Sequence, residues 1–132
     1  MTSNTDVTIR RLTPAERKAS DALQLSCQRD SVALLAELLA DALGLRPLAW
    51  MVAHAGARLT GWCMAQPESR RLDDFSAWRA FLLTRAESRP GLEQSLRLDS
   101  GEMRLAAEWR NYCGTTVTIT LAASIAADLD DP

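Results

Sequence analysis

The chain has 132 residues, of which 47% are hydrophobic and 24% are charged, and its formal net charge at pH 7 is -2. This composition predicts a single domain over residues 1–132 with enough apolar material for a core. Only six glycines and five prolines are present, which excludes a collagen-like or low-complexity chain. No apolar run is long enough to span a bilayer, and the first residues lack a signal-peptide pattern, so we expect a cytoplasmic protein.

Charge and cysteine usage narrow the possible partners. The sequence pI of about 5.4 argues against nucleic acid as the main partner, because nucleic-acid-binding domains are usually basic. Cys27, Cys63 and Cys113 are far apart and odd in number, so they predict reduced thiols and no disulfide framework. His54 is the only histidine, which leaves a zinc site short of ligands. We therefore expect no metal and no cofactor.

Two helices are predicted in the first third of the chain. Residues 1–5 read as a flexible lead and residues 7–12 as a short strand or arm. Thr13, Pro14 and Glu16 then form a capping box with proline at the first helical position. The polar stretch 28–31 ends this helix, and a second helix is predicted over residues 32–43, stopped by Gly44.

The helix over residues 32–43 is apolar on nearly all sides, and its only charges are Glu37 and Asp41. Such a helix must be covered on more than one side, by the core or by a second copy of the chain. The two carboxylates need solvent or a basic partner, for which Arg46 and Arg58 are candidates.

The remaining residues alternate between strand and helix patterns. Residues 48–65 predict a hairpin and residues 72–86 an amphipathic helix, with Asp73 and Asp74 capping its N-terminus. Residues 92–98 predict a possible strand, two further strands follow around residues 103–110 and 116–121, and residues 126–132 read as an acidic tail. The expected fold is α+β, an antiparallel β-sheet built from two hairpins with helices packed on one face.

Motifs of common catalytic sites are missing. The sequence contains no phosphate-binding glycine loop, no zinc-protease motif and no serine-hydrolase elbow. Histidine is the side chain that serves most often as a general base, but the place of His54 beside Ala55-Gly56 is typical of an exposed turn. We therefore assign no catalytic residue and lean away from an enzyme.

Tryptophan, tyrosine and arginine side chains are the best candidates for contacts, because they dominate interface hot spots. Leucines of the apolar helix are candidates as well, because that helix must be covered on more than one side. The predicted interaction residues lie on one strand, on the apolar helix and in one loop: Trp109, Arg104, Arg110, Tyr112, Leu35, Leu38, Leu39, Arg70 and Arg71. The alternative is a ligand pocket between sheet and helices, lined by Trp50, Trp62 and His54. For all the tryptophans, packing in the core remains open as well.

The stretch 96–105, followed by residues 117–121, distantly resembles the β-hairpin region of flagellar hook-length and needle-length control domains. The resemblance covers about a quarter of the chain and consists mainly of alternating apolar residues. The helices that follow the hairpin in that family have no counterpart here, so the resemblance assigns no family.

The sequence therefore favours a non-enzymatic protein–protein interaction module. We expect a homo-oligomer or a small accessory subunit of a larger bacterial or phage assembly. A small-ligand-binding protein or enzyme is the second hypothesis, and a nucleic-acid-directed module is the third.

Overall fold

The computed structural model describes residues 11–126. The elements are α1 (Pro14–Asp41), β1 (Ala49–Val52), β2 (Arg58–Cys63), α2 (Ser69–Ala86), β3 (Leu92–Arg97), β4 (Met103–Trp109), the 3-10 turn η2 (Tyr112–Gly114) and β5 (Thr118–Ile125). The predicted lead, most of the predicted strand over 7–12 and the tail after residue 126 lie outside the described residues. Residues 11 and 12 are irregular.

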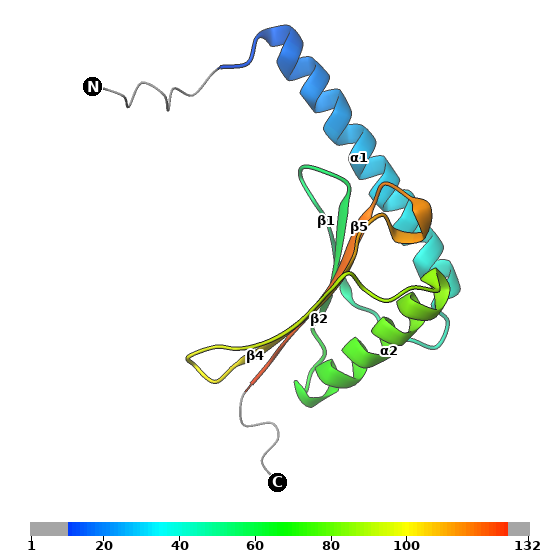
Figure 1. Ribbon diagram of the computed structural model, residues 1–132, viewed down its shortest axis with the longest axis vertical. Coiled ribbons are helices and arrows are strands. Elements are labelled where there is room, and N and C mark those ends of the chain that lie inside the picture. Colours follow the sequence, from blue (N-terminus) through cyan, green and yellow to red (C-terminus); the bar gives the residue numbers. More distant parts are fainter. Residues whose placement is uncertain (1–10, 127–132) are drawn as a thin grey trace, which may run out of the picture.

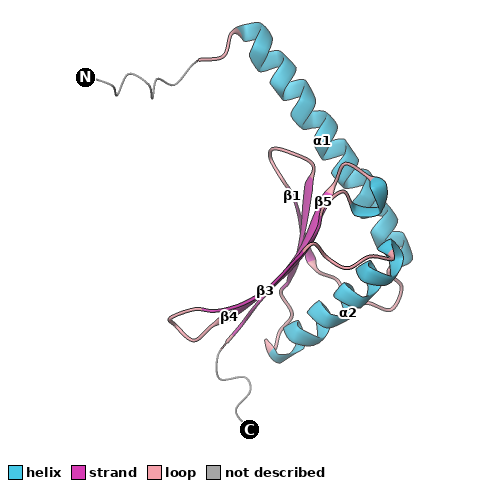
Figure 2. Cartoon of the chain, in the orientation of Figure 1, coloured by secondary structure: helices cyan, strands magenta, loops and turns pink. Residues whose placement is uncertain are grey.

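The five strands form one mixed sheet in the order β1-β2-β5-β4-β3. The α+β expectation is confirmed, and both helices lie on the same side of the sheet (Figures 1 and 2). The prediction of an antiparallel sheet from two hairpins is only partly right, because β2 and β5 run parallel and β3 adds a further hairpin. Leu121, Ala122 and Ala123 of β5 are all buried, because Leu121 and Ala123 face the core while the small side chain of Ala122, on the open face, lies between neighbouring strands on both sides.

Residues 14–41 form one continuous helix, so the prediction of two helices is wrong. The capping box is confirmed: the Glu16 N–H donates to Thr13 Oγ1 at 3.1 Å, and the Thr13 N–H donates to Glu16 Oε1 at 3.0 Å. The polar stretch 28–31 does not end the helix because it contains neither glycine nor proline. Within it, the Ser31 hydroxyl donates to the Cys27 carbonyl one turn earlier, at 3.1 Å, and is buried.

Helix α2 confirms the predicted amphipathic helix but begins at Ser69, three residues early. Asp73 and Asp74 therefore do not cap it. Asp74 instead lies in the core at 4% exposure, and its Oδ1 is 3.3 Å from Arg46 Nε. The helix ends at Ala86, where Glu87 adopts a left-handed conformation.

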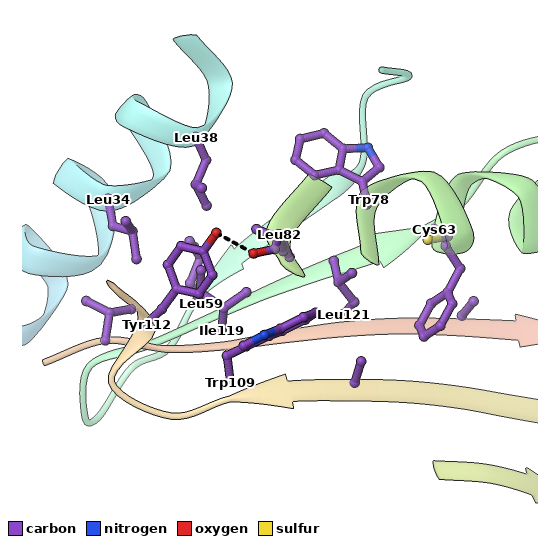
Figure 3. Packing of buried hydrophobic residues seen from close by; sticks show 14 residues of the cluster. Leu34, Leu38, Leu59, Cys63, Trp78, Leu82, Trp109, Tyr112, Ile119 and Leu121 are labelled. Atoms are coloured by element: carbon purple, nitrogen blue, oxygen red, sulfur yellow. Dashed lines mark hydrogen bonds between the residues drawn. The ribbon is translucent and has the colours of Figure 1, made fainter. Parts of the chain in front are cut away.

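The core lies between the sheet and the second half of α1 together with α2 (Figure 3). Leu34 and Leu38 of α1 point into it, and Trp78 and Leu82 enter from α2. The first half of α1 extends past the sheet (Figure 1). Gln24 and Gln28 fasten α1 to the β1–β2 turn by accepting from the Gly56 N–H at 2.7 Å and donating to the Ala53 carbonyl at 3.4 Å.

Candidate interaction surfaces

The two aromatic residues predicted to form a contact surface, Trp109 at the end of β4 and Tyr112 in η2, belong to the core. Trp109 and Tyr112 are 3% and 1% exposed, and their rings meet edge to face at 6.3 Å. Each polar group is bonded inside the protein. Trp109 Nε1 donates to the Ser88 carbonyl at 3.0 Å, and the Tyr112 hydroxyl donates to the Leu82 carbonyl at 3.0 Å (Figure 3). These rings therefore pack against α2 and cannot contact a partner in this arrangement.

The arginines predicted beside them do lie at the surface. Arg104 Nε is 3.6 Å from a Glu102 carboxylate oxygen, and Arg110 Nε is 3.4 Å from one of Glu108. Exposed pairs of this kind contribute little to stability and leave both guanidinium groups accessible. The structure thus separates the predicted arginines from the predicted aromatic residues.

Arg70 and Arg71, which were predicted to lie in a loop, belong to the first turn of α2 and have different environments. Arg70 is exposed, whereas the side chain of Arg71 is only 12% exposed. Arg71 donates from Nε to the Ala65 carbonyl at 3.1 Å and from Nη1 to the Ser124 carbonyl at 3.0 Å. These bonds tie the ends of β2 and β5 to the start of α2, which gives Arg71 a structural role.

The three residues of the predicted ligand pocket are not brought together. Trp50 pairs with Gly61 and Trp62 pairs with Ala49 in the β1–β2 ladder. Since neighbouring positions of a strand face opposite sides, Trp50 lies on the helix side and Trp62, at 37% exposure, on the open side. His54 is exposed in the turn after β1. The Trp50 ring packs edge to face against Trp78 at 5.5 Å.

The predicted leucines of α1 point in different directions. Leu38 is fully buried, Leu35 is half-buried and Leu39 is 49% exposed. Consecutive helix residues are about 100° apart around the axis, so Leu38 and Leu39 cannot both face the core. Only Leu39 of the three is strongly exposed.

Leu39 continues a row of exposed apolar residues that sequence reasoning missed. Leu25 and Val32 are 52% and 53% exposed, and they precede Leu39 at intervals of seven residues, which is two helical turns. We call these three residues, with Arg29 and Ala36 between them, the outer stripe. A shallow depression of about 360 Å³ lies on it, lined by Leu25, Gln28, Arg29, Val32 and Ala33. The seven-residue spacing was the signal that could have revealed the stripe.

The outer stripe lies opposite the buried face of α1. On a helical projection Ser31, Leu34 and Leu38 lie within about 60° of one another, and Val32 and Leu39 lie on the other half of the circle. Leu34 and Leu38 contact the core, but no strand or helix of residues 11–126 covers the outer stripe (Figure 1). The helix therefore has two apolar faces, as its composition predicted, and only one of them is covered within the chain.

Two ionisable side chains of the core, Cys63 and Tyr112, are held in their neutral forms because burial raises their pKa values. Burial raises the pKa of the Cys63 thiol to about 12, the nearby Asp74 carboxylate adds to this effect, and Arg71 opposes it. Burial likewise raises the pKa of Tyr112 to about 12. A thiol of this kind is a poor nucleophile, because the thiolate is the reactive form.

Two further observations concern only the residues that the structure describes. No group of three or more histidine, cysteine, aspartate or glutamate side chains gathers between residues 11 and 126 in a way that could hold a metal ion. Neither α1 nor α2 combines the length and the apolar character that crossing a membrane requires.

Comparison of the chain with protein-family models, with curated proteins and with solved structures found no match. The fold and the surfaces described above are thus the basis for a functional assignment.

Proposed function

We propose that this protein is a non-enzymatic protein–protein interaction module, an accessory subunit whose outer stripe on α1 binds a helix of another polypeptide. The observation that carries the proposal is the half-exposure of Leu25, Val32 and Leu39 on the side of α1 that faces away from the core. Covering the exposed part of each of these side chains contributes about 1 kcal/mol of binding free energy.

The geometry of the stripe favours a helical partner. Side chains repeated every seven residues along about 21 Å of helix match the ridge of a second helix packed at a shallow angle. Lys18 lies one further interval of seven before Leu25, and Arg29 lies within the stripe. Asp41, by contrast, is bound to Arg85, with Asp41 Oδ2 at 3.2 Å from Arg85 Nε. A partner helix with an apolar face flanked by acidic residues is complementary to this surface.

The cellular compartment and the type of assembly are part of the same proposal. Unpaired Cys27, Cys63 and Cys113 support a reducing, cytoplasmic compartment, and the acidic pI supports a protein partner over nucleic acid. The protonated thiol of Cys63 supports a role without covalent catalysis. A small subunit of a bacterial or phage assembly that self-associates is consistent with these features.

Site-specific photocrosslinking tests the proposal. A benzophenone amino acid replaces Val32 or Leu39 in cells that express the protein, and adducts are identified by mass spectrometry. We expect the same second polypeptide from both positions. The matched control places the probe at Glu37, which is exposed on α1 but lies away from the stripe. This control position gives no such adduct.

A substitution within the stripe then distinguishes specific binding from chance proximity. Leu25→Asp removes the adduct at Leu39, since it places a charge on the apolar surface that the partner covers. Glu37→Ala leaves the adduct unchanged. Absence of adducts at both stripe positions would overturn the proposal, and an adduct with a second copy of the chain would replace the foreign helix by self-association.

A further inference from the structure

Strand β3 is an open edge of the sheet. It pairs with β4 on one side, and all six of its residues are exposed. The other edge, β1, has only four residues and follows Pro47, a residue that limits edge pairing. β3 contains no proline, and within residues 11–126 no strand or helix covers its free side. Such an edge is a template for the addition of another strand.

The hairpin bond from the Leu98 N–H to the Glu102 carbonyl, at 2.8 Å, fixes which backbone groups face outward. In an antiparallel ladder, hydrogen-bonded and non-hydrogen-bonded pairs alternate. Even-numbered residues 92, 94 and 96 therefore bond to β4. The N–H and C=O groups of Glu93, Ser95 and Arg97 point away from the sheet, toward the open edge.

The sequence of this edge is complementary to itself. When two copies of β3 run antiparallel with Ser95 opposite Ser95, each Glu93 lies opposite Arg97 of the other copy. All three outward-facing residues of one strand then pair with outward-facing residues of the other. Leu92 lies opposite Leu98 on the other face. A shift by two residues in either direction removes both direct pairings of opposite charge.

The charges of the single chain are consistent with this arrangement. Glu93 Oε1 accepts a hydrogen bond from Arg79 Nε at 2.5 Å, and Arg79 and Arg89 lower the pKa of Glu93. Arg97 has no acidic partner among the described residues. In the paired arrangement Arg97 gains one, and Glu93 is placed between two guanidinium groups.

A groove beside the edge points in the same direction. It has a volume of about 450 Å³ and lies between α2 and β3, where Leu72, Phe75 and Leu105 supply apolar walls. Leu72 is 46% exposed there. A strand added to β3 would extend the sheet beneath this groove.

We propose that a second copy of this chain adds to the free edge of β3, antiparallel about Ser95, so that the two five-stranded sheets become one continuous sheet. The inference rests on the proposed function in treating the chain as an interaction module, but it uses a different surface. The outer stripe of α1 stays free for the partner helix.

Ser95→Pro tests the interface with little risk to the fold. It removes an N–H that faces solvent in the single chain, a position where an edge strand tolerates proline. Light scattering after size exclusion should give a dimer of the 14.5 kDa wild-type chain and a monomer for this variant. Ser95→Ala keeps the N–H and remains a dimer. Circular dichroism of the variants should match that of the wild type.

Charge-swap variants test the register. Glu93→Lys places an ammonium group opposite Arg97 of the other copy, and Arg97→Glu places two carboxylates opposite each other. Each variant alone should dimerise at least tenfold more weakly than the wild type. A mixture of the two restores dimers, because only the mixed pair avoids setting like charges against each other at both positions.

The outcomes separate this inference from the proposed function. A wild-type monomer at ~100 µM, or a dimer unaffected by Ser95→Pro, overturns β3 pairing. Crosslinks from Val32 in the Ser95→Pro background then report on the α1 surface alone. The presence of these crosslinks supports the proposed function whether or not the wild-type chain dimerises through β3. If the crosslinks are absent while the wild-type chain does dimerise through β3, only the proposed function is overturned.

Discussion

Trp50 closes directly over Gly61, its partner across the β1–β2 ladder. A Cβ atom on Gly61 would lie 2.9 Å from ring carbons Cη2 and Cζ3 of Trp50 and 3.0 Å from Cδ1 of Leu48. The same indole packs edge to face on Trp78, at 5.5 Å between ring centroids. The glycine thus makes room for an aromatic contact that joins the hairpin to α2.

Gly61→Ala should therefore destabilise the protein by about 2 kcal/mol, because the added methyl group forces the ring from its place. Urea unfolding followed by tryptophan fluorescence measures this change. Gly91→Ala is the matched control, since its nearest atom to an added Cβ is 3.9 Å away. Its unfolding free energy should stay within about 0.5 kcal/mol of the wild type. Equal effects of the two substitutions would contradict the close packing.

The parts of the fold that could be predicted from sequence are those fixed by local chemistry. The capping box at Thr13 and Glu16 depends on residues three apart, and the apolar periodicity of α2 is contained in its own turns. The continuity of α1 could not be predicted, because polar residues 28–31 resemble a boundary. In the structure Asp30 instead accepts a bond from Thr116 Oγ1, 86 residues away, at 3.1 Å.

Non-local pairing accounts for the other differences. The parallel contact of β2 with β5 joins segments that are separated in sequence by α2 and two strands. The alternation of apolar and polar residues along a strand does not reveal in which direction that strand runs relative to its neighbour. The candidate surface depended on the same kind of information. Trp109 is buried because parts of the chain distant in sequence surround it, among them Ser88, whose carbonyl accepts a hydrogen bond from Trp109 Nε1. Leu39 is exposed because α1 continues through residue 32, and the continuous helix sets the direction in which residue 39 points.

The two apolar faces of α1 predict opposite results for neighbouring leucines. Leu38→Ala should cost about 3 kcal/mol of unfolding free energy, because Leu38 is fully buried and its removal leaves a cavity. Leu39→Ala should cost less than about 0.5 kcal/mol in the isolated chain, because its side chain is half exposed. Guanidinium unfolding measures both. A large cost for Leu39→Ala in a monomeric sample would show that the outer stripe belongs to the core.

Alkaline pH should destabilise the protein through Cys63. Burial raises the pKa of this thiol from 9.0 to about 12, so the unfolded chain loses the proton at lower pH than the folded one. The contribution is fully present below pH 9 and is lost as pH rises toward 12. Between these pH values the unfolding free energy falls with pH, at a slope that approaches about 1.4 kcal/mol per pH unit.

Urea unfolding at a series of pH values between 9 and 10, under reducing conditions, isolates the thiol. Tyr112 adds its own loss mainly above pH 10, because burial raises its pKa from 10.0 to about 12. Cys63→Ala should make the unfolding free energy fall less steeply with pH, by up to about 1.4 kcal/mol per pH unit, which is what one proton contributes. This change of slope is independent of how the substitution alters stability at a single pH. Cys113→Ala, which removes an exposed thiol, is the matched control. An unchanged slope in Cys63→Ala would contradict the assignment.

The buried carboxylate of Asp74 should make Arg46 important for stability although Arg46 is partly exposed. Asp74 Oδ1 is 3.3 Å from Arg46 Nε, and Asp74 Oδ2 has no hydrogen-bond partner among the described residues. Arg46→Met removes the cation and leaves a charged group in the core. We expect a loss of about 2 kcal/mol, less than for a fully buried pair because the Arg46 side chain is 44% exposed.

A double-mutant cycle measures this coupling. Asp74→Leu removes the buried charge and lets the Arg46 guanidinium turn to water, so it should cost less than Arg46→Met. In the Asp74→Leu background, adding Arg46→Met should cost almost nothing, because no carboxylate is left to neutralise. The backbone carbonyl at position 46 still accepts from Trp78 Nε1 in all four proteins, at 2.7 Å in the wild type, so the backbone contact is constant. Additive losses in the double variant would mean that each residue acts through its packing alone.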